Sequence, residues 1–165
     1  METGAELSTC GTYRYALWRR WSDSSSLLFV MLNPSTADES QDDPTIRRCI
    51  SFAQQWGHGG ITIANLFAFR SPHPSALRGA TDPIGPENDQ WLQKLAGQSA
   101  VVVGAWGNHG LYLKRGEAVA AMVPPMQCLG MTKRSQPRHP LYVAADTGLQ
   151  SMQSCRECNG PTRTI

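Results

Sequence analysis

The chain has 165 residues, of which 41% are hydrophobic and 17% are charged, and this composition is typical of a soluble globular protein. Lysine and arginine number 15 against 13 aspartates and glutamates, a net charge of +2 that neither demands nor excludes a nucleic-acid ligand. The length fits one domain with its own core. Because no long apolar run and no signal-like N-terminal segment occurs, we expect a cytoplasmic protein with no membrane partner.

Five cysteines occur in the chain, and their odd number is more typical of a reducing compartment than of a disulfide framework. Cys155 and Cys158 form a CxxC pair, which without a second pair is weak evidence for zinc. The pair lies in a polar tail, and we expect residues 144–165 to be flexible. We expect no metal site in the domain and no cofactor, and we leave metal binding by the pair open.

The first part of the chain alternates between strand and helix patterns. Residues 1–11 contain few large apolar side chains and are expected to fray. Residues 12–18 alternate in polarity, which is typical of an antiparallel edge strand. Residues 27–32 form a short apolar run that predicts a buried strand. The Asp43-Pro44 pair then supplies a cap and a first-turn proline, so a helix is predicted to begin there.

Strands and helices continue to alternate in the rest of the chain. The predicted strands are 61–70, which begins with the β-branched run 61–64, then 100–105 and 126–129, and the predicted helices are 88–96 and 111–122. The expected fold class is α/β, namely a three-layer α/β/α sandwich around a mostly parallel sheet of about four strands. The N-terminal strand adds an antiparallel edge, and the single domain is expected to cover residues 12–143.

Polar and aromatic side chains gather in the loops that follow the predicted strands. If the sheet is parallel, these loops emerge at one edge, where α/β proteins bind their ligands. The candidate residues at this edge are Asn33, Ser35, Thr36, Asp38, Asn65, Phe67, Arg70, Trp106, Asn108, His109, Lys133, Arg138 and His139. Amides and aromatic rings together are how proteins hold an unstacked nucleobase, because amides read its edge and rings its face.

Simpler interpretations exist for some of these residues. Asn33-Pro34 is also a turn sequence, and Ser35 or Thr36 can cap a helix. His139 precedes a proline and is also typical of a turn histidine. A protein interface at this edge is a further alternative, since several tryptophans cannot be assigned to the core from sequence. The chain contains neither a GxxxxGK phosphate loop nor a GxSxG nucleophile motif.

Several long motifs, in order, resemble the bacterial and phage family catalogued as domain of unknown function 1643. The resemblance covers Tyr13 to Tyr142. The motifs are YRYAL, LNPSTAD, DPTIRRC, NLFAFRSPHP, DPIGPEND, AWGNHG and LGMTKRSQPRHPLY. Since the biochemistry of that family is largely unassigned, the resemblance implies the domain and not the reaction.

A more distant resemblance, to the uracil-DNA glycosylase superfamily, rests on three short segments. These are Leu32–Ser35, Asn65–Phe67 and Arg138–Leu141. The first segment lacks the superfamily's Asp-Pro-Tyr form, and the third lacks the usual Ser-Pro after His-Pro. The resemblance implies a fold of that superfamily, with Asn65 reading the edge of a base.

The same resemblance implies roles for the other candidates. Asn33, with Asp38, would hold a water molecule beside the anomeric carbon, and Phe67 or Phe69 would stack on the base. His139 would stabilise negative charge on the departing base. Arg138, Lys133 and Ser35 would contact phosphates.

Two functions remain open from the sequence. The first is hydrolysis of an N-glycosidic bond to a nucleobase, ordinary or modified, in DNA or in a nucleotide. The alternative is a non-catalytic module that binds nucleic acid or a nucleotide on the same fold. In both cases DNA or a nucleotide is the expected partner, and the oligomeric state is left open.

Overall fold

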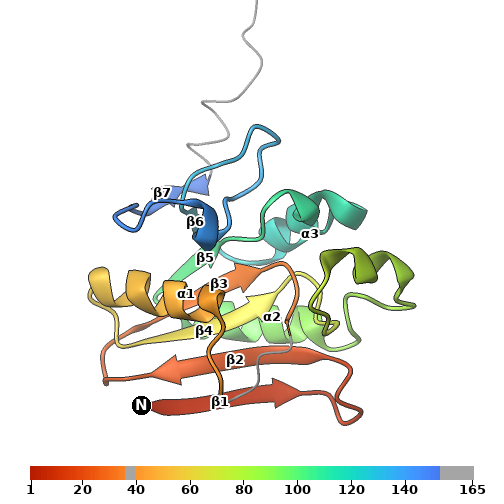
Figure 1. Ribbon diagram of the computed structural model, residues 1–165, viewed down its shortest axis with the longest axis horizontal. Coiled ribbons are helices and arrows are strands. Elements are labelled where there is room, and N and C mark those ends of the chain that lie inside the picture. The colour runs from red at the N-terminus through yellow and green to blue at the C-terminus, as the bar shows by residue number, and fades with distance from the viewer. Residues whose placement is uncertain (36–39, 153–165) are drawn as a thin grey trace, which may run out of the picture.

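The computed structural model describes residues 1–35 and 40–152, and Figure 1 shows the arrangement of their helices and strands. The strands are β1 Glu2–Leu7, β2 Arg14–Arg20, β3 Ser26–Met31, β4 Gly60–Asn65, β5 Val101–Gly104, β6 Gln127–Cys128 and β7 Gln150–Ser151. The helices are α1 Pro44–Gln55, α2 Asn88–Gln98 and α3 Arg115–Met122, with 3-10 turns η1 Pro74–Gly79, η2 Asn108–Lys114 and η3 Pro140–Tyr142. The α/β class is therefore confirmed.

The sheet is larger and more mixed than expected. In the described residues it has seven strands, in the order β1-β2-β4-β3-β5-β6-β7. The β4, β3, β5 and β6 strands are mutually parallel and correspond to the four predicted core strands, but β4 ends at Asn65, before the predicted end at Arg70. β1, β2 and β7 pair antiparallel at the two sides. The expectation of a mostly parallel sheet of four strands is thus wrong in size and in strand direction.

Residues 1–11, which were expected to fray, contain the strand β1. β1 is held by a side chain of its neighbour β2. Gly4 pairs directly with Trp18 of β2, and a Cβ atom at Gly4 would lie 2.1 Å from the Trp18 ring. The indole covers the glycine, so β1 needs few apolar side chains of its own. At the other side, β7 and the buried Met152 continue the fold past residue 143. Residues 153–165, with Cys155 and Cys158, lie outside the described residues.

Successive residues of β3 face opposite sides of the sheet, and each side has its own core. Leu27, Phe29 and Met31 pack with Ile46 and Phe52 of α1. Leu28 and Val30 pack in a second core, to which α2 contributes Leu92 and Ala96 and α3 contributes Val119. Helices therefore cover both faces of the sheet, as a strand buried on both sides requires.

α1 begins as predicted. The Asp43 carboxylate accepts a hydrogen bond of 2.8 Å from the Ile46 backbone N–H, and Pro44 occupies the first turn. The helix predicted over 111–122 starts later, at Arg115, because Leu113 and Lys114 have φ values of 54° and 51°. Those left-handed conformations end η2 and turn the chain into α3. In the described residues, no helix is long and apolar enough to cross a membrane.

The connections between the parallel strands create a crevice. The chain leaves β3 through α1 and joins β4 on one side, whereas it leaves β5 through α3 and joins β6 on the other. The loops that follow β3 and β5 therefore diverge at the carboxyl edge of the sheet. Open α/β sheets bind ligands at such a point.

Candidate functional site

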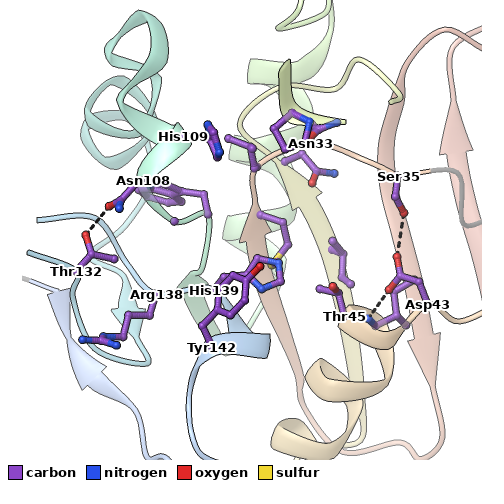
Figure 2. Close-up of a pocket in the computed structure, with 18 of the residues that line it drawn as sticks. Asn33, Ser35, Asp43, Thr45, Asn108, His109, Thr132, Arg138, His139 and Tyr142 are labelled. Carbon is purple, nitrogen blue, oxygen red and sulfur yellow. Dashed lines mark hydrogen bonds between the residues drawn. The ribbon is translucent and has the colours of Figure 1, made fainter. Parts of the chain in front are cut away.

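A cavity of about 490 Å³ opens at this edge, on the side covered by α1, and its size suits a small organic ligand. Figure 2 shows Ser35, Asp43 and Thr45 along one wall and Asn108 and Thr132 along the opposite one, with His139 between them. Eight of the predicted residues line it. They are Asn33, Ser35, Asn65, Trp106, Asn108, His109, Arg138 and His139. The prediction that separate loops converge at one edge is therefore confirmed for these residues.

Asn65 is the most unusual side chain of the cavity. It ends β4 beside Met31 of β3 and is only 2% exposed. Its amide nitrogen is buried and has no hydrogen-bond partner among the described residues. A buried donor left unbonded costs about 1–3 kcal/mol. An amide kept in this state at a cavity wall is suited to a ligand that supplies the missing acceptor.

Asn33 has a fixed orientation. Its amide nitrogen donates to the Ser71 carbonyl oxygen at 2.9 Å and to the Pro34 carbonyl oxygen at 3.2 Å. Both amide hydrogens are thereby used to hold the turn after β3. The amide oxygen is the part that is left to accept a hydrogen bond from a ligand or water, so Asn33 is both a turn residue and a cavity residue.

Asp43 and Ser35 connect the loop after β3 to the start of α1. The Ser35 hydroxyl donates to one Asp43 carboxylate oxygen at 2.9 Å, while the other oxygen accepts the Ile46 N–H. Both residues line the cavity. Asp43, the cap of α1, therefore also brings a negative charge to the cavity wall.

His139 faces the cavity in a defined protonation state. Its Nδ1 accepts a hydrogen bond of 3.2 Å from the Leu141 backbone N–H, so in the neutral ring the proton is on Nε2. Burial lowers the pKa of His139 below its ordinary value of 6.5, and the charge of Asp43 opposes this shift. At pH 7 the ring is therefore a neutral donor through Nε2.

This assignment predicts a measurable pH dependence. Nitrogen-detected NMR of His139 is expected to show the Nε2–H tautomer at pH 7 and a pKa below 6.5. Protonation of Nδ1 at lower pH removes the acceptor for the Leu141 N–H, so the turn at residues 139–142 should loosen in the same pH range. A proton on Nδ1 at neutral pH, or a pKa above 6.5, would contradict the assignment.

Two loops of the cavity are joined to each other. The Thr132 hydroxyl donates to the Asn108 amide oxygen at 2.6 Å, and the Trp106 indole N–H donates to the Gln136 amide oxygen at 2.9 Å. Trp106 is 2% exposed and packs against Gly110, where a Cβ atom would lie 2.0 Å from the indole. Trp106 is thus a fixed wall of the cavity.

A family model described as "Protein of unknown function (DUF1643)" matches residues 14–141. The chain belongs to the DUF1643 family. No curated protein and no solved structure matches it, so the resemblance to the uracil-DNA glycosylase superfamily remains a prediction. The matched region of the DUF1643 chain runs from β2 to η3 and holds all of the cavity lining except Tyr142.

Three predicted residues lie elsewhere in this DUF1643 protein. Phe67 is fully buried in the core, where its ring centroid is 5.6 Å from that of Tyr112. Arg70 is half-buried and donates to the Gly11 carbonyl oxygen at 3.1 Å. Lys133 is exposed outside the cavity. Thr36 and Asp38 lie outside the described residues of the chain.

The cavity also has residues that sequence reasoning missed. The polar ones are Arg14, Asp43, Thr45, Thr132 and Tyr142. Arg14 is 4% exposed; burial and the neighbouring charge of Arg70 lower its pKa to about 10, while Asp43 opposes the shift. Arg14 reaches the cavity because β2 runs antiparallel to β4, which brings the first residue of β2 to the carboxyl edge. Its polarity pattern indicated a strand but not this position.

A metal centre is not formed by the described part of the chain. Within residues 1–35 and 40–152, no three His, Cys, Asp or Glu side chains gather closely enough to hold an ion. The cavity instead offers amides, the imidazoles of His109 and His139, the Asp43 carboxylate and the buried guanidinium of Arg14. These groups bind and orient a polar ligand by hydrogen bonds.

Proposed function

We propose that the cavity receives a nucleobase, in DNA or in a nucleotide, and that the protein hydrolyses its N-glycosidic bond. The observation that carries the proposal is the buried and unbonded amide of Asn65. A nucleobase edge presents acceptors and donors in one plane, which is what an amide pairs with. The distant resemblance to the uracil-DNA glycosylase superfamily supports the same role for Asn65.

In this reaction a water oxygen bonds to the anomeric carbon and the carbon–nitrogen bond to the base breaks. The Asn33 amide oxygen accepts one hydrogen of the water and directs its lone pair to the sugar. The water proton passes to the Asp43 carboxylate, which takes the place that sequence reasoning gave to Asp38. Catalysis of this kind depends on positioning more than on covalent chemistry.

The bonding electron pair leaves with the base, which departs as an anion. The Nε2–H group of His139 donates to the acceptor on which this charge develops. A neutral imidazole is suited to the task because it adds a donor without a buried charge before the reaction. The Leu141 N–H on Nδ1 fixes the tautomer that this donation requires.

A non-catalytic binding module is the second candidate, and one observation favours it. Asp43 is the only carboxylate among the described lining residues, and both of its oxygens already accept a hydrogen bond. Each oxygen has only one lone pair left to orient water or take a proton. A protein that reads a base without cleaving it needs no more than this.

A base-release assay separates the two candidates. Purified protein is incubated with duplex DNA, single strands and free nucleotides that carry uracil, hypoxanthine or hypermodified pyrimidines, and abasic sites and free bases are measured. Release that is lost in Asn33→Ala and kept in His58→Ala supports the glycosidase, since His58 lies in the turn at the opposite edge of the sheet. Binding without release from any substrate would contradict it and support the binding module.

A further inference from the structure

Positive charge is concentrated in three of the four loops that leave the carboxyl edge. Segments 70–79, 106–115 and 129–143 together contain seven of the 15 lysines and arginines and none of the 13 acidic residues. Arg115 is buried and paired with Asp89. Lys133, Arg134 and Arg138 are exposed and form no ion pair within the described residues. The part of the edge formed by these three loops is therefore basic although the whole chain is nearly neutral, whereas the fourth loop, residues 32–43, contains four acidic residues and no basic one.

Of the three exposed basic side chains, those of Lys133 and Arg134 lie outside the cavity and that of Arg138 lies at its rim. Lys133 and Arg134 belong to the turn between Thr132 and Gln136 and do not line the cavity. Figure 2 shows the Arg138 side chain directed away from the centre of the cavity, and its Nε donates to the Met131 carbonyl oxygen at 3.2 Å. A single nucleotide bound at Asn65 would leave these cations unused.

Tyr142 supplies an aromatic ring at the same place. It lines the mouth of the cavity and is 79% exposed, more than any other aromatic side chain among the described residues. Its ring centroid is 5.4 Å from that of His139, with an angle of 48° between the planes. The ring is held beside the cavity with most of its surface open, so it can stack on a flat group that stays outside.

We propose that the ligand is a single-stranded polynucleotide, which extends the proposed function and rests on it. One unstacked nucleotide enters the cavity, the adjacent base stacks on Tyr142, and the neighbouring phosphates contact Arg138, Lys133 and Arg134. Cations along a backbone path together with an aromatic platform are the features by which proteins bind single strands. A paired base offers neither its edge to Asn65 nor its face to Tyr142.

The test measures binding by the full chain of a fluorescent 12-nucleotide DNA strand, the matching duplex and a deoxynucleoside monophosphate over a range of salt concentrations. We expect Tyr142→Ala to weaken strand binding about 5- to 100-fold and to weaken binding of the monophosphate much less. Replacing Lys133 and Arg134 together by alanine should reduce the slope of log K against log salt by about 1.4. Arg20→Ala is the matched control, because Arg20 is an exposed arginine at the opposite edge, beside Gly60.

Several outcomes would overturn the proposal. These are tighter binding of the duplex than of the strand, equal binding of the monophosphate, a salt slope near zero, no strand binding at all, or an unchanged affinity in Tyr142→Ala. Failure here and failure of the glycosidase are distinguishable. Base release from free nucleotides with no preference for a strand would support the glycosidase and contradict the polynucleotide ligand. Salt-sensitive strand binding without base release would support the polynucleotide ligand and contradict the glycosidase.

Discussion

Asn65→Leu is expected to abolish ligand binding and to make the protein more stable. Leucine has a similar volume, and it removes a buried N–H group that has no partner among the described residues. The free energy of unfolding should rise by about 1 kcal/mol, with an increase of about 2–4 °C in Tm for a domain of this size. Urea denaturation and ligand titration of the same sample measure the two effects.

Asn88 offers a matched control because it is also a fully buried asparagine. Its amide nitrogen donates to the carbonyl oxygens of Asn65 and Leu66 at 2.9 and 3.1 Å. Asn88→Leu removes both bonds, and the Leu66 oxygen keeps only its hydrogen bond of 2.8 Å from the Arg115 Nε–H. The free energy of unfolding should fall by about 1–2 kcal/mol. If Asn65→Leu destabilises the protein to the same extent, its amide is bonded in the folded state and the assignment of Asn65 to a ligand is wrong.

His139→Ala is expected to reduce base release by about 10²–10³-fold, the usual effect of removing one preorganised donor. The reduction should appear in kcat, because the donated hydrogen bond strengthens as the base acquires charge. Stability should fall only slightly, since the lost bond to the Leu141 N–H belongs to an exposed turn. Single-turnover base release and urea denaturation measure the two quantities.

His139→Asn distinguishes two roles of His139, hydrogen-bond donation to the base and stabilisation of the turn. Asparagine is a good cap and can still accept the Leu141 N–H, but its side chain is too short to place a donor where Nε2 lies. We expect a stable protein that is as inactive as His139→Ala. Full activity of His139→Asn would show that His139 only stabilises the turn.

The core of the fold could be predicted because each buried element has its own apolar pattern. The run from Leu27 to Leu32 has alternate residues in the two cores, and the cap at Asp43 is a local signal for α1. The parallel order of these strands then brings their exits to one edge. For that reason the sequence alone could place Asn33, Asn65 and His139 at one edge, where they line one cavity.

The remaining features depend on contacts between distant segments. β1 packs through Gly4 against Trp18, which no pattern within β1 indicates. Arg14 reaches the cavity only because its strand runs antiparallel to β4. Phe67 was predicted to stack on a ligand but lies in the core. The alternation of side chains between the two faces of the sheet stops where β4 ends, so Leu66 and Phe67 are buried in the same core. Local periodicity carries no information on any of these arrangements.

Because Trp106 has a fixed position in the cavity wall, its fluorescence can report on ligand binding. The chain has five tryptophans, and Trp106 alone lines the cavity in the described structure. Trp18, Trp21, Trp56 and Trp91 pack against Gly4, His58, Phe52 and Tyr15, respectively. A base bound beside this indole is expected to quench the fluorescence of one of the five tryptophans. Occupancy of the cavity can therefore be followed by intrinsic tryptophan fluorescence without a label.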